Sequence, residues 1–288
     1  MDYAKEFAIP PREKVSLSRI DPQDTRGLAD KKEGVRLLKE NVKRIAELQN
    51  TLYAENTQAL LVIFQAMDAA GKDGTIRGVT SGVNPAGFQV ASFKQPSREE
   101  LDHDYLWRCM RHLPERGRIG IFNRSYYEEV LVVRVHPQIL ASQPLPTGLK
   151  GADIWSRRFD EIVDFENHLA GNGTAIVKFF LHISKEEQRE RFLARLDDPS
   201  KNWKFSLQDV REREHWSTYM HAYEEAISAT SAACAPWYVI PANHKWFARA
   251  VVAEIIAKTL ESMDPEYPKL TAEARAELQT GKKLLGVV

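Results

Sequence analysis

The sequence predicts an α/β fold, and three observations support this prediction. An apolar run of strand length, residues 60–64, leads into a loop with a Gly-Lys pair and then into a stretch of helical character. Further short apolar runs follow at residues 89–93, 119–122, 174–181 and 236–241, and they read as four more strands with helical stretches between them. A chain of 288 residues is long enough for one large α/β domain or two small ones.

Composition excludes several classes of protein. Lys plus Arg equal Asp plus Glu at 40 each, so the basic bias of a nucleic-acid binder is absent. Two cysteines, Cys109 and Cys234, make a disulfide framework unexpected and suit a reducing cytoplasm. No apolar run approaches the roughly 18 residues that span a bilayer, and the charged N-terminus lacks a signal core. We therefore expect a cytoplasmic protein with no nucleic-acid or membrane partner.

The N-terminal quarter precedes the first strand. Residues 1–28 mix Pro, Asp and Arg without a helical stripe, so we expect an arm that lies over the domain or against a partner chain. Residues 30–53 have apolar side chains at steps of three and four, which predicts an amphipathic helix. This helix packs on its own sheet or forms an oligomer contact, and the pattern leaves both possibilities open.

The central motif is the loop after the strand at 60–64. An apolar strand, a tight turn and a helix N-terminus form a phosphate site, because unpaired N–H groups and the helix dipole attract an anion there. Gly71 and Lys72 match the pattern G-x-x-x-x-G-K-[ST], with Ala66 at the first glycine and Asp73 at the hydroxyl position. The alternative is an ordinary strand–turn–helix in which Gly71 is only a turn residue.

Two carboxylates lie in this loop. Asp68 and Asp73 would repel a polyanion unless a cation lay between them and the ligand. Mg²⁺ is typically held by one or two carboxylates together with substrate phosphates. We therefore expect Asp68 and Asp73 to bind one or more Mg²⁺ ions.

A second polar cluster follows the strand at 119–122. Asn123 stands where phosphate-binding enzymes often place a metal-binding Asp, and Arg124 is placed to meet phosphate. Glu128 supplies a carboxylate five residues on, for a metal or a nucleotide, although a surface role is equally consistent. Before this strand, a capping box at Ser97 and Glu100 predicts a helix through Leu113.

Residues 184–212 are strongly charged and predict a helical lid inserted in the core. Ser184 with Glu187 caps one helix, and Ser206 with Asp209 is expected to cap a long helix to about Thr230. Basic side chains that face inward from a lid supply charge to a phosphoryl group and exclude water. A solvated charged face is the alternative. Residues 265–288 are expected to form a surface tail.

Three stretches resemble the polyphosphate kinase 2 family. They are LLVIFQAMDAAGKDGTIRGVTSGVNPAGFQV, LPERGRIGIFNRSYYEEVLVVRVHP and KEEQRERFLARLDDPSKNWKFSLQDVREREHW. The MDAAGKDG loop is more specific than a bare phosphate-loop pattern because it carries Asp in place of Ser or Thr. The resemblance covers about residues 15–265.

This resemblance implies a single P-loop kinase-like domain over residues 1–288, a three-layer sandwich with a five-stranded parallel sheet and a helical lid. It implies that Asp68, Lys72 and Asp73 lie in the first phosphate motif and that Asn123, Arg124 and Glu128 lie in the second. Phosphate contacts are expected from the remaining loop, helix and lid positions: Ala70, Gly71, Gly74, Thr75, Arg77, Arg189, Lys201 and Lys204.

The activity implied is reversible, Mg²⁺-dependent phosphoryl transfer from inorganic polyphosphate to AMP or ADP, toward ATP. Asn123 with Glu128 is similar to the branch that accepts both nucleotides, and the resemblance also implies a homo-oligomer, a dimer or tetramer. Two alternatives stay open. One is an ATP-dependent nucleoside monophosphate kinase, and the other is a non-catalytic protein that binds polyphosphate or nucleotide.

Overall fold

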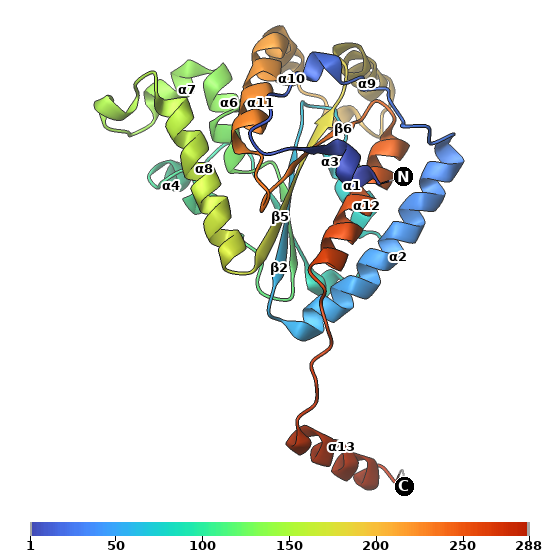
Figure 1. The fold of residues 1–288 in the computed structure, drawn as a ribbon. Coiled ribbons are helices and arrows are strands. Elements are labelled where there is room, and N and C mark those ends of the chain that lie inside the picture. Colours follow the sequence, from blue (N-terminus) through green and yellow to red (C-terminus); the bar gives the residue numbers. More distant parts are fainter. Residues whose placement is uncertain (1, 287–288) are drawn as a thin grey trace.

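The computed structural model describes residues 2–286, which form a mixed sheet between two layers of helices (Figure 1). The strand order is β1-β6-β5-β2-β4-β3. The strands are β1 (Ala8–Ile9), β2 (Ala59–Gln65), β3 (Phe88–Ser92), β4 (Ile119–Asn123), β5 (Thr174–His182) and β6 (Trp237–Pro241). The predicted α/β class and parallel sheet are confirmed, since β3, β4, β2, β5 and β6 pair in parallel.

The predicted number of strands is wrong by one. Residues of the N-terminal arm add β1, which pairs antiparallel with β6 through Ala8 and Tyr238. A strand of two residues has no alternation of apolar and polar positions, so the sequence pattern carries no signal for it. The sheet therefore has six strands.

Side chains alternate between the two faces of the sheet, as in any strand. On β2, Leu60, Val62 and Phe64 pack against α1, α2, α3 and α12, whereas Leu61 and Ile63 face the opposite layer with α6, α8 and α11.

The helices are α1 (Tyr3–Phe7), α2 (Lys31–Glu55), α3 (Lys72–Thr80), α4 (Arg98–Leu101), α5 (Trp107–Met110), α6 (Val132–Val135), α7 (Pro137–Ser142), α8 (Ile154–Gly171), α9 (Lys185–Asp197), α10 (Leu207–Arg211), α11 (Trp216–Thr230), α12 (Lys245–Ser262) and α13 (Ala272–Leu284). Short 3-10 helices are η1 (Leu17–Arg19), η2 (Pro85–Gly87), η3 (Tyr126–Glu129), η4 (Thr147–Leu149), η5 (Asn202–Lys204) and η6 (Glu212–His215).

Two predicted helices are broken in the structure. The helix expected through Leu113 divides into α4 and α5, because the Asp104 carboxylate accepts a hydrogen bond from the Leu106 N–H at 2.9 Å and forms a turn. The long helix expected from Ser206 divides into α10, η6 and α11. Capping signals located the start of each helix but carried no information on where it ends.

The two ends of the chain differ in their packing. Tyr3 and Phe7 of α1 are buried, and both rings contact the Phe247 ring edge-on, so the arm lies over its own domain. The C-terminal α13 contains no buried residue and projects away from the sheet at the end of an extended segment (Figure 1). None of the helices within residues 2–286 is long and apolar enough to cross a membrane.

The sheet places the functional loops at one edge. Because β3, β4, β2, β5 and β6 are parallel, the residues that follow them converge at the carboxyl end of the sheet. Phe64 of β2 pairs with Asn123 of β4, and Ser92 of β3 pairs with the same Asn123. The loop after β2 therefore lies beside Arg124 and beside the residues that follow Ser92.

Candidate active site

The loop after β2, residues 66–71, forms the floor of a cavity of about 610 Å³ at the carboxyl end of the sheet. Ala69 and Gly71 adopt positive φ angles of 63° and 102°, which turn the chain sharply into α3. Gly71 is the N-cap of α3 and supplies no capping side chain. The first turn of this helix therefore presents its N–H groups to the cavity, as an anion site requires.

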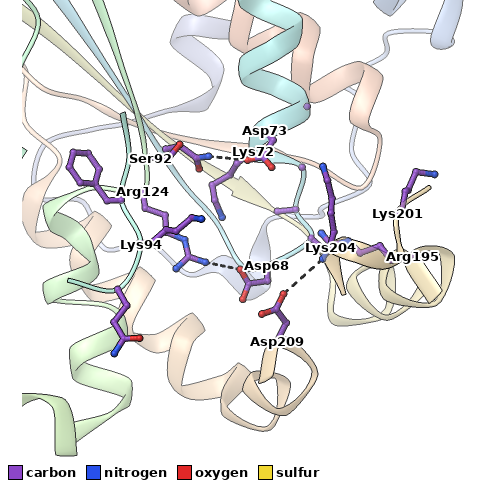
Figure 2. A pocket seen from close by; sticks show the side chains of 17 residues that line it. Asp68, Lys72, Asp73, Ser92, Lys94, Arg124, Arg195, Lys201, Lys204 and Asp209 are labelled. Atoms are coloured by element: carbon purple, nitrogen blue, oxygen red, sulfur yellow. Dashed lines mark hydrogen bonds and ion pairs between the residues drawn. The ribbon is translucent and has the colours of Figure 1, made fainter. Parts of the chain in front are cut away.

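Four segments line this cavity, which we call the loop–lid cavity (Figure 2). They are the phosphate loop with the start of α3, the end of β3, the end of β4 and the predicted lid. The lining residues are Asp68, Ala69, Ala70, Gly71, Lys72, Asp73, Gly74, Ser92, Phe93, Lys94, Gln95, Asn123, Arg124, Arg195, Lys201, Lys204 and Asp209.

Lys72, the first residue of α3, contacts the loop directly. Its Nζ donates a hydrogen bond to the Ala66 carbonyl at 2.9 Å, across the turn. Burial lowers the pKa of Lys72, and the nearby Arg124 lowers it further, while Asp68, Glu128 and Asp73 act in the opposite direction. The ammonium thus lies between a second cation and three carboxylates, in the part of the cavity where phosphate would meet the helix N-terminus.

Asn123 and Arg124 connect the ends of β2 and β4. The Asn123 Nδ2 donates to Asp73 Oδ1 at 2.9 Å. Arg124, with a positive φ of 64°, donates through Nη2 to Asp68 Oδ1 at 2.9 Å and through Nη1 to Glu128 Oε2 at 3.4 Å. The charge of Glu128 raises the pKa of Arg124 by more than burial lowers it. Asp68 and Asp73 are therefore oriented by Arg124, which follows β4, and by Asn123, the last residue of β4.

The two loop carboxylates fit a divalent cation that is shared with substrate. Within residues 2–286 no cluster of three or more His, Cys, Asp or Glu side chains could hold a metal by itself. Two carboxylates facing one phosphate cavity are the donor set that Mg²⁺ takes when substrate phosphates complete its shell. In the described chain the protein hydrogen bonds to Asp68 and Asp73 use Oδ1 of each carboxylate, and Oδ2 of each accepts none.

Arg191 fixes the loop from behind. Its guanidinium is buried and donates to the carbonyl oxygens of Ala69 at 3.0 Å, Ala70 at 2.7 Å, Ala242 at 2.6 Å and Asn243 at 3.0 Å. Burial lowers the pKa of Arg191, and Glu187 opposes this shift through a hydrogen bond of 2.7 Å. Arg191 thus joins the loop after β2 to the loop after β6 and connects both loops to α9.

The predicted phosphate contacts divide into two groups. Ala70, Gly71, Gly74, Lys201 and Lys204 line the cavity. The other three predicted contacts lie outside the lining: Thr75 is buried behind the loop, Arg77 is exposed in the last turn of α3, and Arg189 is exposed on α9, where it pairs with Glu190 at 2.8 Å. Helical periodicity explains why Arg189 lies outside the cavity. Arg191 and Arg195 occupy the face of α9 that turns toward the core, and Arg189 lies on the opposite face.

Several lining residues were missed from the sequence. Lys94 and Gln95 follow β3, and Arg195 and Asp209 approach from the lid, where they form an ion pair of 3.9 Å. Figure 2 shows Lys94 and Arg124 on one side of Asp68, with Arg195 and Lys204 on the other. A polar residue directly after an apolar strand was the available signal for Lys94. No local pattern identifies Asp209.

A buried polar network supports η3, which contains Glu128. Lys178 is fully buried, and its Nζ donates to Glu166 Oε2 at 2.5 Å, the Tyr127 hydroxyl at 3.0 Å and the Thr230 carbonyl at 2.8 Å. Glu166 Oε1 accepts from the hydroxyls of Tyr126 at 2.8 Å and Tyr127 at 3.0 Å. The network anchors the two tyrosines that follow Arg124, and through them it holds the second phosphate motif in place.

Comparison with known proteins agrees with this arrangement. The family model of Polyphosphate kinase 2 (PPK2) matches residues 28–268. The ADP-polyphosphate phosphotransferase of Rhodopseudomonas palustris is 54% identical over 275 residues, 95% of each chain. The AMP/ADP-polyphosphate phosphotransferase of Meiothermus ruber is 46% identical over 266 residues, covering 92% of this chain and 96% of that one.

A solved structure also matches the whole fold. The crystal structure of Polyphosphate Kinase 2 from Arthrobacter aurescens TC1 superimposes with a TM-score of 0.87 at 41% sequence identity, covering 97% of each chain. The family match spans both phosphate motifs and the predicted lid. The chain is a member of the polyphosphate kinase 2 family.

Proposed function

We propose that this protein transfers a phosphoryl group from inorganic polyphosphate to AMP or ADP and so forms ATP. The observation that carries the proposal is the loop–lid cavity. Cations from the phosphate loop, the ends of β3 and β4, and the lid surround one space that also contains two oriented carboxylates. The named activities of the Rhodopseudomonas and Meiothermus relatives support the same donor and acceptors.

The chemistry follows from how phosphoryl transfer is accelerated. The reaction leaves little covalent work for the protein, so positioning and charge neutralisation supply most of the rate. The N–H groups at the start of α3 and the Lys72 ammonium would hold the donor phosphates. Lys201, Lys204 and Arg195 would add positive charge from the lid and exclude water.

Asp68 and Asp73 would hold a divalent cation, for which we propose Mg²⁺. The ion would supply positive charge that neutralises the phosphates during transfer. Arg124 and Asn123 orient the two carboxylates through their Oδ1 atoms, which leaves Oδ2 of each for the ion. Asp68 after β2 and Asp73 at the start of α3 would thus hold the cation, each oriented by a residue at the end of β4.

The acceptor nucleotide would lie on the side of the cavity lined by Lys94 and Arg124. The predicted site residue Glu128 lies outside the lining and reaches this side only through its ion pair with Arg124. We propose that both AMP and ADP are accepted, on the basis of Asn123 and Glu128. Asn123 donates a hydrogen bond to Asp73 and, being neutral, adds no negative charge there. The carboxylate of Glu128 pairs with Arg124 instead. The Meiothermus relative, whose name includes both nucleotides, supports this proposal.

We also propose a cytoplasmic homo-oligomer, with the α2 region as the first contact to examine. Val35 and Tyr53 are large exposed side chains on α2 and are 39% and 44% exposed. Light scattering after gel filtration measures the mass directly. A dimer or tetramer is expected, and a monomer at all concentrations would exclude the oligomer.

The test of function varies donor and acceptor independently. Purified protein with Mg²⁺ is given AMP or ADP, each with long-chain polyphosphate, and AMP is also given with ATP as donor. ATP from both polyphosphate reactions is expected. Product only with ATP as donor would establish a nucleoside monophosphate kinase. Tight polyphosphate binding without turnover would establish a non-catalytic binding protein.

A further inference from the structure

The C-terminal helix α13 buries none of its 13 residues against the described part of the chain. It projects from the domain at the end of the segment formed by residues 264–271 (Figure 1). The family match ends at residue 268, before α13 begins. An isolated helix of this length is only marginally stable in water. Contact with another molecule would therefore stabilise α13.

One face of α13 carries apolar residues in the pattern of a coiled coil. Ala274, Leu278, Gly281 and the C-cap residue Leu285 follow one another at steps of four, three and four residues. This is the spacing of the d and a positions of a heptad, which form the contact face of paired helices. Leu278 and Leu285 are 54% and 83% exposed, so the single chain leaves this face uncovered. We call these four residues the α13 seam.

Contacts within the chain do not explain the glycine on the seam. Glycine disfavours a helix more than any other residue except proline. A Cβ atom at Gly281 would meet no atom of residues 2–286 within 4 Å outside the backbone of its own helix. Gly281 lies between Leu278 and Leu285 on the seam, where the backbone of a facing helix would approach most closely.

The charges beside the seam match those of a second α13 that runs in the same direction. Glu277 occupies a g position, and Lys282, five residues later, occupies the next e position. In parallel paired helices a g residue faces the e residue of the following heptad in the partner. Glu277 of each chain would therefore meet Lys282 of the other. Among residues 2–286 neither side chain has an ion-pair partner, since the last ion pair along the chain joins Lys269 and Glu266 at 3.8 Å.

The opposite orientation would bring like charges together. When two paired helices run in opposite directions, e positions face e positions across the seam. The e positions of α13 are Arg275 and Lys282, which are both basic. Charge therefore favours the parallel orientation, in which the same surface of both chains forms the contact, as in a two-fold dimer.

We propose that α13 pairs in parallel with α13 of a second copy of this chain. This inference rests on the homo-oligomer proposed above and adds to it a contact separate from α2. Such a short pair binds weakly between free chains, but an oligomer already holds both helices at a high effective concentration. Residues 264–271 span up to about 26 Å when extended, so each α13 reaches beyond its own domain toward the other.

Cysteine cross-linking tests the pairing directly. Cys234 is first replaced by Ser, because it is only partly buried, whereas Cys109 is buried. Ala274→Cys then places a thiol on the seam, and the matched control Ala276→Cys places one on the exposed opposite face of α13. After mild oxidation with diamide, Ala274→Cys should form about tenfold more disulfide-linked dimer than Ala276→Cys, because the bond requires Cα atoms within about 7 Å. Equal cross-linking at both positions, or none at position 274, would overturn the proposal.

Charge reversal tests the direction of the pair. In the Ala274→Cys protein, Glu277→Lys places two lysines opposite each other on both sides of the seam. Cross-linking should then slow about fivefold, the scale for replacing two exposed ion pairs by like charges. Adding Lys282→Glu restores opposite charges and should restore the rate. An unchanged rate with Glu277→Lys, or no recovery in the double reversal, would contradict the parallel pair.

Light scattering separates this inference from the proposed oligomer. A wild-type protein that is a monomer at all concentrations would overturn both the homo-oligomer and the α13 pair. An oligomeric wild type whose Ala274→Cys variant forms no linked dimer would overturn the α13 pair alone. The helix lies outside the loop–lid cavity, and cross-linking is measured without substrate, so neither result depends on the proposed activity.

Discussion

Lys72 illustrates how a single residue depends on its surroundings. Its ammonium lies among Asp68, Asp73, Glu128 and Arg124, and it hydrogen-bonds to the loop that it would share with phosphate. The side chain therefore places a positive charge at one defined position. If it is removed, no neighbouring side chain supplies a charge at that position. The same reasoning applies to Asp73, whose carboxylate Asn123 orients.

Lys72→Ala should lower kcat by about two to three orders of magnitude, the scale for losing one contact to a developing charge. Asp73→Ala should have an effect of similar size. Steady-state assays of polyphosphate-driven ATP formation measure both, and Lys39→Ala on the exposed face of α2 serves as the control. A folded Lys72→Ala protein with near wild-type turnover would contradict the assignment of the loop.

At this scale the sequence predicted the residues that belong to local motifs. Asp68, Lys72, Asp73, Asn123 and Arg124 all line the cavity, because each lies in or directly after a strand-ending loop. Residues brought in by the lid were harder to predict, since their orientation depends on helix phase. Arg189 and Arg195 are six positions apart on α9, and only the second lines the cavity.

The buried network around β5 shows how one element positions another. Lys178 on β5 and Glu166 on α8 are fully buried and satisfied by each other and by the tyrosines of η3. Burial lowers the pKa of Lys178 and raises that of Glu166, and the pairing opposes both shifts. Loss of one partner would leave a charge buried alone.

Lys178→Met should therefore reduce the free energy of unfolding by about 3–5 kcal/mol. Adding Glu166→Leu should recover most of this loss, because no unpaired charge remains. Urea denaturation of the two variants gives the difference, with the slope of the transition as a check on two-state behaviour. If the single variant is as stable as the wild type, the network is not the anchor of η3.

The base of the lid contains a second coupled group. Glu212 of η6 accepts hydrogen bonds from His136 Nε2 at 2.8 Å, the Tyr219 hydroxyl at 3.0 Å and Gln208 Nε2 at 2.8 Å. Burial alone would raise the pKa of Glu212, but these hydrogen bonds outweigh it and lower the pKa. Its contribution to stability is complete above the pKa of the unfolded chain and is lost as pH falls through the folded pKa.

Glu212→Gln should thus destabilise the protein by about 1–2 kcal/mol at pH 5 and by much less at pH 3. As the pH falls toward the lowered pKa of Glu212, its carboxyl group takes up a proton and loses the charge that distinguishes it from Gln. Urea unfolding at the two pH values measures the difference. Equal destabilisation at both would show that the carboxylate charge plays no part in holding the lid base.

Elements were predictable where their signal is local. The five parallel strands follow from apolar runs, α2 follows from the periodicity of its apolar residues, and the start of α9 follows from its cap at Ser184. The breaks between α4 and α5 and between α10 and α11 were not predictable, because side chains that bond to a turn or to a distant helix decide them. Asp104 makes the first of these bonds, and Glu212 makes the second with His136, which lies between α6 and α7.

The whole molecule carries no net charge, yet six lysines and arginines line the loop–lid cavity at the carboxyl end of the sheet. Only the fold brings together the lysines and arginines that follow β2, β3 and β4 with those of the lid. Composition therefore excluded a generally basic protein but could not reveal a local polyanion site. The antiparallel β1 and the packing of α1 on Phe247 likewise depend on contacts between distant parts of the chain.

In the proposed reaction the phosphate loop and the predicted lid act together on polyphosphate. The most direct test measures ATP formed from ADP, polyphosphate and Mg²⁺ by the wild type, by a Lys201→Ala/Lys204→Ala variant and by Arg189→Ala. We expect ATP from the wild type, a loss of about a hundredfold in kcat/KM for the double variant and little change for Arg189→Ala, whose side chain lies outside the cavity. A wild-type protein that binds polyphosphate but forms no ATP, or a double variant as active as Arg189→Ala, would contradict the account.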